Sequence, residues 1–269
     1  MLGNALPEKR GVRVALIVEQ FTSRSDNFAV LIHDAATGLT AAIDAPETAP
    51  IEAKLKEKGW RLDHIFTTHH HADHTEGNLP LKAEYASTIT GPAGEADKVP
   101  GIDRRVKGGD HFMFGDREVR VIDTPGHTLG HITYYLPDAG VAFVGDTLFA
   151  MGCGRVLEGT AEMMWASLER LRALHDDTQI YCGHEYTETN ARFALTVEPD
   201  NAELAARYAE VKRLRAAGKP TLPTTIGLEK RTNPFLRSRE PTLRANLGME
   251  HASPAEVFAE VRARKDRFK

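Results

Sequence analysis

Five of the twelve histidines lie between residues 64 and 74, and their spacing suggests metal chemistry. They are His64, His69, His70, His71 and His74. Such a cluster in an otherwise unbiased sequence is typical of a metal site, because neutral imidazole is a common ligand of transition ions. In an extended segment, residues two apart point the same way, so His69 and His71 can share one cation. Asp73 and His74 follow at once and can serve a second cation nearby.

Three further polar side chains follow predicted strands. His127 lies in a Pro-Gly turn after a strand at 118–123, Asp146 follows a strand at 141–144, and His184 follows a strand at 179–182. Functional groups collect beyond the carboxyl ends of strands in open α/β architectures, so these positions suit one shared site. A catalytic zinc ion takes about three protein ligands and keeps one position for water. Two such ions need about six ligands and a group between them, which this set can supply.

The elements that must position these residues are mostly strands in the first half of the chain. Strands are predicted at 12–19, 28–33, 39–44, 61–66, 106–114, 118–123, 131–136, 141–144 and 179–182. Helices are predicted at 48–58, ending at Gly59, and from the N-cap Thr160 to about residue 174. After residue 185 helices predominate, at 187–197, 201–217 and 253–267, with a Pro- and Thr-rich connector at 220–233. We therefore expect an α/β domain over residues 1–186 and a helical domain over residues 187–269.

Composition sets the broad class. The 269 residues are 41% hydrophobic, enough to bury a substantial core, and the longest aliphatic runs are too short to span a membrane. The first residues lack the pattern of a secretory signal, and Cys153 and Cys182 cannot form a disulfide framework. A net charge of −4 gives little support for nucleic-acid binding. We expect a cytoplasmic, monomeric chain without membrane or nucleic-acid partners.

Four segments carry a resemblance to a known family. They are Thr-His-His-His-Ala-Asp-His at 68–74, Thr-Pro-Gly-His-Thr-Leu-Gly-His at 124–131, Gly-Asp-Thr-Leu-Phe at 145–149 and Tyr-Cys-Gly-His-Glu-Tyr-Thr at 181–187. Together they resemble the metallo-β-lactamase fold, which implies an αββα sandwich. Gly-Cys-Gly-Arg at 152–155, Glu-Gly-Thr at 158–160, Asn-Pro-Phe-Leu-Arg at 233–237 and the last five residues resemble one branch, glyoxalase II (hydroxyacylglutathione hydrolase). That branch implies an additional C-terminal helical domain.

The resemblance implies a role for each ligand. His69, His71 and His127 would bind a first metal; Asp73, His74 and His184 would bind a second; Asp146 would bridge the two. Zinc is the first expectation for both ions, with iron or manganese as alternatives that accept the same donors. The implied reaction is hydrolysis of S-D-lactoylglutathione to glutathione and D-lactate, the second step of methylglyoxal detoxification. A hydroxide between the two metals would attack the thioester carbonyl, with Asp73 and Asp146 as the catalytic carboxylates.

The same resemblance implies a glutathione pocket between the two domains. Arg155, Tyr186, Arg262 and Lys265 match positions that hold the tripeptide in the family, and a cationic pocket suits the two carboxylates of glutathione. The chain departs from the family at residues 156–157, where Val-Leu replaces common aromatic residues. Arg155 also stands where a lysine is frequent. On composition alone, the cations of residues 262–269 could instead form only a solvated helix face.

Other side chains near the motifs have simpler expected roles. His70 points away from its neighbours in an extended segment, so we expect it to support the site rather than bind metal. We expect His131 to orient a ligand or a strand through hydrogen bonds. Cys153 and Cys182 are expected to be buried structural thiols.

Two other functions compete with the thioesterase. A mononuclear iron persulfide dioxygenase shares this fold, but such relatives tend to lack the full second ligand set and the long helical tail. A nucleic-acid-processing member of the fold would need a basic face, which the net charge does not favour.

Overall fold

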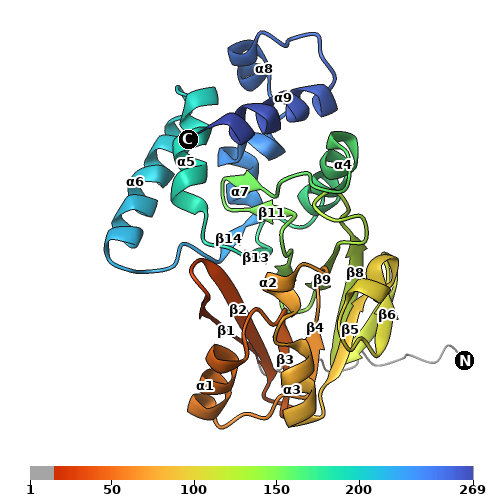
Figure 1. Cartoon of the computed structure of the whole chain (residues 1–269). Helices are drawn as coiled ribbons and strands as arrows, with labels where there is room; N and C mark the ends of the chain where they lie inside the picture. The colour runs from red at the N-terminus through yellow and green to blue at the C-terminus, as the bar shows by residue number, and fades with distance from the viewer. Residues whose placement is uncertain (1–14, 269) are drawn as a thin grey trace, which may run out of the picture.

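The computed structural model describes residues 15–268, in which two six-stranded sheets dominate the first two thirds of the chain (Figure 1). The first sheet has its strands in sequence order: β1 (Leu16–Ser23), β2 (Asn27–Asp34), β3 (Leu39–Ile43), β4 (His64–Phe66), β5 (Thr88–Pro92) and β6 (Arg104–Val106). The first three strands pair antiparallel, and β3 to β6 run parallel. The carboxyl ends of the parallel strands lie at the same edge of the sheet, and the segment with the histidine cluster begins there, after β4.

The second sheet has the order β14-β13-β10-β9-β8-β7. Its strands are β7 (His111–Phe114), β8 (Arg117–Asp123), β9 (Ile132–Leu136), β10 (Val141–Phe143), β13 (Gln179–Tyr181) and β14 (Thr224–Thr225). The pair β10 and β13 is parallel, and the other pairs are antiparallel. A two-stranded hairpin, β11 (Leu148–Phe149) and β12 (Gly152–Cys153), follows β10.

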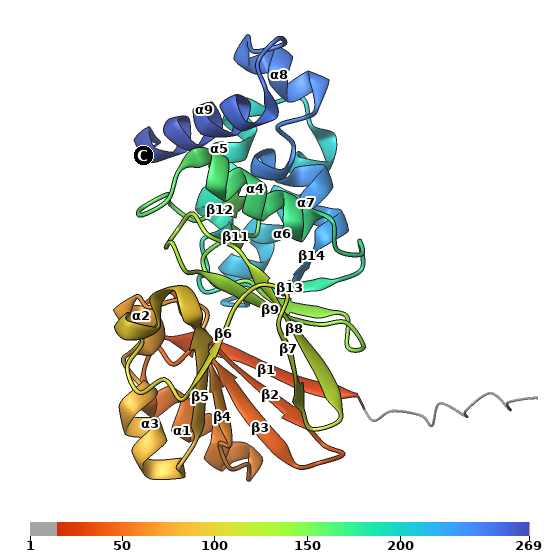
Figure 2. The same cartoon turned by 90° about the vertical axis from the view of Figure 1, so that its right-hand side faces the viewer.

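Alternation of side chains along the strands builds the layers. In β2, Val30 and Ile32 point into a core between the two sheets, whereas Ala29 and Leu31 point to the opposite face. That outer face is covered by α1 (Thr48–Lys58) and α3 (Asn78–Tyr85). The outer face of the second sheet is covered by helices that include α4 (Ala161–Arg172), as Figure 2 shows. The predicted αββα sandwich is therefore confirmed.

Helices beyond the second sheet make up the C-terminal part of the chain. They are α5 (Thr187–Val197), α6 (Ala202–Ala216), α7 (Ile226–Thr232), the 3-10 helix η2 (Pro234–Leu236), α8 (Pro241–Leu247) and α9 (Pro254–Arg267). Helix α9 packs on α4 through the fully buried Phe258, whose ring centroid lies 6.1 Å from that of Trp165. Within residues 15–268, no helix is both long and apolar enough to cross a membrane.

Local signals place several helix ends where the sequence predicts them. Helix α1 ends at Gly59, whose φ of 68° is the left-handed conformation that glycine adopts without strain. The Thr160 hydroxyl accepts a hydrogen bond from the backbone N–H of Met163, and Ser253 forms a capping box with Glu256. The start of the first predicted strand, residues 12–14, lies outside the described residues, as does Lys269.

Two element predictions are wrong. Residues 106–114 do not form one strand, because a turn at 107–110 separates β6 from β7 and the two strands join different sheets. Its hydrogen bonds run from the N–H of Asp110 to the Lys107 carbonyl oxygen and from the Lys107 N–H to the Asp110 carboxylate, both at 3.0 Å. The connector at 220–233 contains β14 and α7, which Thr225 caps by accepting from the Leu228 N–H. Also not predicted were α2 (Ala72–Thr75), α3, β5, the 3-10 helix η1 (Ala93–Lys98) and α8.

Candidate metal centre

Chain segments that follow four strands bring the seven predicted ligands together. His69, His71, Asp73 and His74 follow β4, His127 follows β8, Asp146 follows β10, and His184 follows β13. Asp73 and His74 lie in the short helix α2 rather than in an extended segment. Gly145 allows the close approach of Asp146 to the β4 loop, because a Cβ atom at this position would lie 2.5 Å from the Thr68 hydroxyl oxygen.

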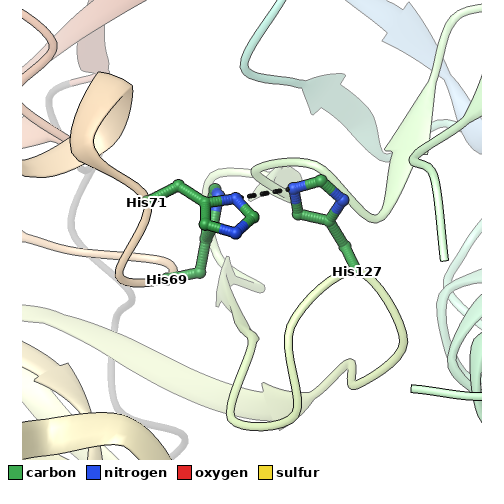
Figure 3. A group of neighbouring side chains, drawn as sticks. All are labelled: His69, His71 and His127. Atoms are coloured by element: carbon green, nitrogen blue, oxygen red, sulfur yellow. Dashed lines mark hydrogen bonds between the residues drawn. The ribbon is translucent and has the colours of Figure 1, made fainter. Parts of the chain in front are cut away.

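Three histidines form the first group. The possible ligand atoms of His69, His71 and His127 all lie within 4.8 Å of one another. Nδ1 of His71 is 3.0 Å from Nε2 of His127, the contact drawn as a dashed line in Figure 3. His69 is fully buried, and its ring centroid lies 4.9 Å from that of His71 and 5.1 Å from that of His127. Three converging imidazoles are a common zinc-binding arrangement.

Asp73, His74 and His184 form the second group, and their possible ligand atoms also lie within 4.8 Å of one another. Oδ2 of Asp73 is 3.4 Å from Nε2 of His184 and 3.6 Å from Nε2 of His74. His74 and His184 are buried, whereas the Asp73 side chain is 37% exposed. One carboxylate therefore joins two imidazoles at the solvent side of the group.

Asp146 lies between the two groups. Its Oδ2 atom is 3.5 Å from Nε2 of His127 in the first group and 3.3 Å from Nε2 of His184 in the second. Its Oδ1 atom is 3.4 Å from Nε2 of His74. A carboxylate offers two oxygens, so Asp146 can contact ligands of both groups at once.

Hydrogen bonds outside the two groups orient the histidine rings. Nδ1 of His74 contacts the Asp44 carboxylate at 2.9 Å, and Nδ1 of His184 contacts that of Asp26 at 2.9 Å. Nδ1 of His127 donates to the backbone oxygen of Arg155 at 2.9 Å. In each ring the Nδ1 atom is engaged away from the centre, so Nε2 is the atom presented to it.

The sequence did not identify Asp26 and Asp44 as part of the site. Asp44 directly follows β3, and Asp26 directly precedes β2, so each lies at a strand end as the ligands do. A strand-end position is too common for an aspartate to single out either residue, and only the contact with a histidine ring reveals its role. The prediction for His131 is confirmed, since its Nε2 atom accepts from the backbone N–H of Asp146 at 3.1 Å.

Several buried atoms of the centre fit a bound cation. Nε2 of His69, Nε2 of His74 and Oδ1 of Asp146 are buried and have no hydrogen-bond partner among the described residues. Buried polar atoms without partners are rare, because losing water without a replacement is costly. All three are nitrogen or oxygen atoms of the kind that bind zinc, iron and manganese, and their side chains converge on one place. The residues present therefore fit a metal centre with two positions.

The charges of the centre favour cations as well. Burial alone would raise the pKa of the Asp146 carboxyl, but His74 and His184 outweigh it and hold that pKa well below its usual range. The hydrogen bond from His184 likewise holds the pKa of Asp73 well below its usual range. Burial would lower the pKa of His184, yet Asp146 and Asp73 raise it to about 11. The carboxylates that stabilise a proton on His184 would also stabilise a divalent cation beside it.

A cavity of about 600 Å³ opens onto this centre. His127 and Asp146 form part of its wall, and the four predicted substrate contacts line it as well: Arg155, Tyr186, Arg262 and Lys265. The structure thus brings together residues that lie far apart in the sequence. The ring of Tyr186 stacks on that of His184, with centroids 4.8 Å apart and an angle of 4° between the planes. The pocket and the metal centre are therefore in direct contact.

The four pocket residues differ in burial and in the hydrogen bonds that they make within the protein. The guanidinium of Arg262 is buried and donates to the Cys153 carbonyl oxygen at 2.9 Å and to the Asp266 carboxylate at 2.8 Å. Arg155 is exposed. Burial, with the nearby cations Arg262 and Arg155, lowers the pKa of Lys265 to about 8. Arg155 and Lys265 are therefore the more available cations, whereas Arg262 also ties α9 to β12.

The replaced residues at 156–157 differ in exposure. Val156 packs against the core of the helical layer, whereas the side chain of Leu157 is 58% exposed. Cys153 and Cys182 are buried free thiols, as predicted. Burial raises the pKa of Cys153 to about 11, so this thiol stays protonated at neutral pH.

Comparisons with known proteins agree with this architecture. Residues 17–184 match the model of the metallo-β-lactamase superfamily, and residues 185–268 match that of the hydroxyacylglutathione hydrolase C-terminus. The hydroxyacylglutathione hydrolase of Brucella ovis is 60% identical over 253 residues, which cover 94% of this chain and 98% of that protein. The crystal structure of ETHE1 from Myxococcus xanthus matches with a TM-score of 0.64 and 28% identity over 94% of this chain and 100% of that one.

A crystal structure of the BLEG-1 B3 metallo-β-lactamase is similar in fold, with a TM-score of 0.63 and 19% identity over 82% of this chain and 99% of that one. The ligand segments, the helical C-terminal part and the relatives of high identity all point in the same direction. The chain belongs to the hydroxyacylglutathione hydrolase (glyoxalase II) family of the metallo-β-lactamase superfamily.

Proposed function

We propose that this chain hydrolyses S-D-lactoylglutathione to glutathione and D-lactate at a centre with two metal positions. The observation that carries the proposal is the place of Asp146, within 3.5 Å of His127 in the first group and of His184 in the second. The same carboxylate lines the cavity that holds the predicted glutathione contacts. Family membership at 60% identity supports the thioester substrate.

The seven side chains would divide between two divalent cations. His69, His71 and His127 would hold the first, Asp73, His74 and His184 the second, and Asp146 would contact both. Bound divalent cations supply an activated water near neutral pH and polarise the thioester carbonyl. We propose zinc at both positions, while iron and manganese accept the same nitrogen and oxygen donors.

Asp73 and Asp146 are the proposed catalytic carboxylates. Both have a pKa held well below the usual range, so both are ionised at neutral pH and can accept a hydrogen bond from the attacking water. Asp73 is partly exposed, so its carboxylate is accessible to water. Water forms a C–O bond at the thioester carbonyl carbon and gives up its protons to nearby carboxylates and solvent. The C–S bond then breaks, and the sulfur leaves as a thiolate. Because a thiolate is a stable anion, the reaction needs no strong proton donor from the protein.

The pocket residues would hold the glutathione part. Arg155 and Lys265 present cationic groups suited to its two carboxylates, and Tyr186 offers a ring and a hydroxyl beside the metal centre. Arg262 would shape the pocket wall as well as contribute charge, because its guanidinium is already engaged by Cys153 and Asp266. This arrangement would direct the thioester carbonyl toward the metal centre.

One chain would suffice for catalysis, because all seven ligands and all four pocket residues come from a single copy. We propose a cytoplasmic monomer on this basis and on the absence of a disulfide framework. We also propose that the chain divides at residue 186 into a catalytic domain and a helical substrate-binding domain. This division is supported by the change from strands to helices after β13, although β14 returns to pair with β13.

The persulfide dioxygenase alternative has less support. It expects an incomplete second metal group, whereas Asp73, His74 and His184 converge here. The helical C-terminal part also matches the hydroxyacylglutathione hydrolase family over its whole length. Oxygen consumption with glutathione persulfide would revive that alternative.

The first test is turnover of S-D-lactoylglutathione by the purified protein, before and after chelation and after restoring zinc or iron. We expect rapid hydrolysis that disappears with the metal and returns with it, at about two metal ions per chain. Elemental analysis of the protein as purified identifies the metal. A fully metallated protein without turnover would contradict the proposed substrate but leave the metal centre standing.

A further inference from the structure

The loops that carry His69, His71 and His127 follow strands of different sheets. His69 and His71 follow β4 of the first sheet, whereas His127 follows β8 of the second. At their bases the two loops share one backbone hydrogen bond, from Ile132 to the Thr68 carbonyl oxygen, at 3.0 Å. Three-histidine coordination depends on the separation of these loops, so a group that spans them would control it.

Glu95, in the 3-10 helix η1 after β5, spans the two loops with one carboxylate. Its Oε1 atom accepts the backbone N–H of His70 at 2.7 Å, and its Oε2 atom accepts the backbone N–H of Gly130 at 2.8 Å. His70 lies between the ligands His69 and His71, and Gly130 lies three residues after His127. The Glu95 side chain is only 3% exposed, so water competes little with these bonds.

The packing around Glu95 leaves little room for adjustment. A Cβ atom at Gly130 would lie 2.8 Å from both Cγ and Oε2 of Glu95, and a Cβ atom at Gly94 would lie 3.1 Å from Cα of Gly130. The ring of His70 lies beside the same carboxylate and that of Glu158, with its Nδ1 atom 3.1 Å from Oε1 of Glu95 and its Nε2 atom 3.4 Å from Glu158. Glu158 in turn accepts the backbone N–H of Leu129 at 3.0 Å.

We infer that Glu95 is a positioning residue that sets the distance between His127 and the pair His69 and His71, and thereby the affinity of the first metal position. The carboxylate needs both oxygens for this role, because each accepts from a different loop. This role would also fit the expectation that His70 supports the site rather than binding metal. The inference rests on the metal centre proposed above.

The test is Glu95→Gln, which preserves the shape of the side chain but leaves only one oxygen to accept a hydrogen bond. Zinc affinity is measured by competition with a chromophoric chelator in two backgrounds that each retain one metal position. His184→Ala isolates the first position, and His127→Ala isolates the second. We expect Glu95→Gln to weaken binding about 10- to 100-fold in the first background and to leave the second unchanged.

A matched control separates positioning from general stability. Glu198 is also a buried carboxylate, but it pairs with Arg237 in the helical part of the chain at 2.9 Å. Glu198→Gln should lower the melting temperature without changing zinc affinity in either background. If Glu95→Gln behaves like this control, or weakens both positions equally, the inference is wrong.

A second variant covers the case in which Glu95→Gln does not fold. Gly130→Ala would push a methyl group against the Glu95 carboxylate and should produce the same selective loss at the first position. Failure of the proposed metal centre can be told apart from failure of the role of Glu95. A wild-type protein that binds fewer than two zinc ions would refute the metal centre itself. Normal wild-type binding with unchanged affinity in both variants would refute only the role of Glu95.

Discussion

Nδ1 of His74 lies 2.9 Å from Oδ2 of Asp44, and both side chains are buried beneath the metal centre. The same carboxylate accepts the backbone N–H of Thr68 at 2.7 Å and its hydroxyl at 2.9 Å. Asp44 therefore fixes the ring of His74 and the start of the loop that carries His69. With Nδ1 engaged, His74 presents Nε2 to the centre.

Asp44→Asn should weaken zinc binding at the second position about 10- to 100-fold, because an amide orients the His74 ring less strongly than a carboxylate. Zinc competition in the His127→Ala background measures this position alone. Asp63→Asn is a suitable control, since Asp63 accepts the Thr40 N–H at the far end of the strands. Equal affinity in Asp44→Asn and the control would contradict the orienting role.

Asp146→Ala should remove the carboxylate that contacts both groups of metal ligands. We expect fewer than two tightly bound metal ions per chain and a fall in kcat/KM of at least about 10²-fold, because one carboxylate contacts ligands of both groups. Elemental analysis and steady-state kinetics provide the two measurements. Asp176→Ala, which removes a surface partner of Lys230, should change neither. Full activity with both metals retained in Asp146→Ala would show that the proposed mechanism is wrong.

Substrate binding should weaken in alkaline solution through Lys265. Its pKa is about 8, lowered by burial and by the nearby cations Arg262 and Arg155. Below this value the side chain is protonated and attracts a carboxylate, whereas above it the charge is lost. We expect KM to rise between about pH 7 and about pH 9 in the wild type.

Lys265→Arg provides the control for this pH dependence, because a guanidinium stays charged throughout that range. Its KM should change little with pH, even if its absolute value differs from that of the wild type. Parallel pH profiles of KM for the two proteins would assign the titration to another group.

Phe258→Ala tests the link between the helical packing and the pocket. Phe258 is fully buried between Trp165 and Phe235, and its helix α9 carries Arg262 and Lys265. Loss of the ring should lower the free energy of unfolding by about 3–5 kcal/mol. KM should rise while the metal content stays at the wild-type level, because α9 supplies pocket residues but no metal ligand. Denaturant unfolding, elemental analysis and kinetics measure the three quantities.

Leu204→Ala provides a matched loss of core volume. Leu204 is fully buried in the small core between α5 and α6. Its truncation should cost about 2–5 kcal/mol without raising KM. A similar rise of KM in both variants would mean that lowered stability, rather than the position of α9, disturbs the pocket.

Much of the candidate site could be predicted from local sequence signals. The metal-ligand residues can be identified from short sequence motifs. The strand ends that precede His127, Asp146 and His184 were predicted correctly because Val, Ile and Phe are enriched in these strands. Caps such as Thr160 and Gly59 are equally local, since each depends on a few neighbouring backbone groups. The layer order followed from the resemblance to a known fold.

One of the two errors overlooked a local turn, and the other occurred where distant parts of the chain decide the outcome. Residues 106–114 were predicted as one strand, but Lys-Gly-Gly-Asp at 107–110 is a local turn signal. The strands on either side of this turn pair in different sheets, although both contribute side chains to the core between the sheets. Helix α7 was not predicted in its Pro- and Thr-rich segment, because its stability depends on burial of Ile226 and on the ion pair of the buried Glu229 with Arg207. Propensity alone cannot register such contacts.

The sequence by itself determined which side chains could bind metal, because imidazole and carboxylate donors and their close spacing are local properties. Only the tertiary structure decided how Asp26, Asp44 and Glu95 take part. Each is a single acidic residue without a motif around it, and its role arises from hydrogen bonds to residues far away in the chain. Such pairings depend on how two sheets and their loops pack together, which no short stretch of sequence encodes.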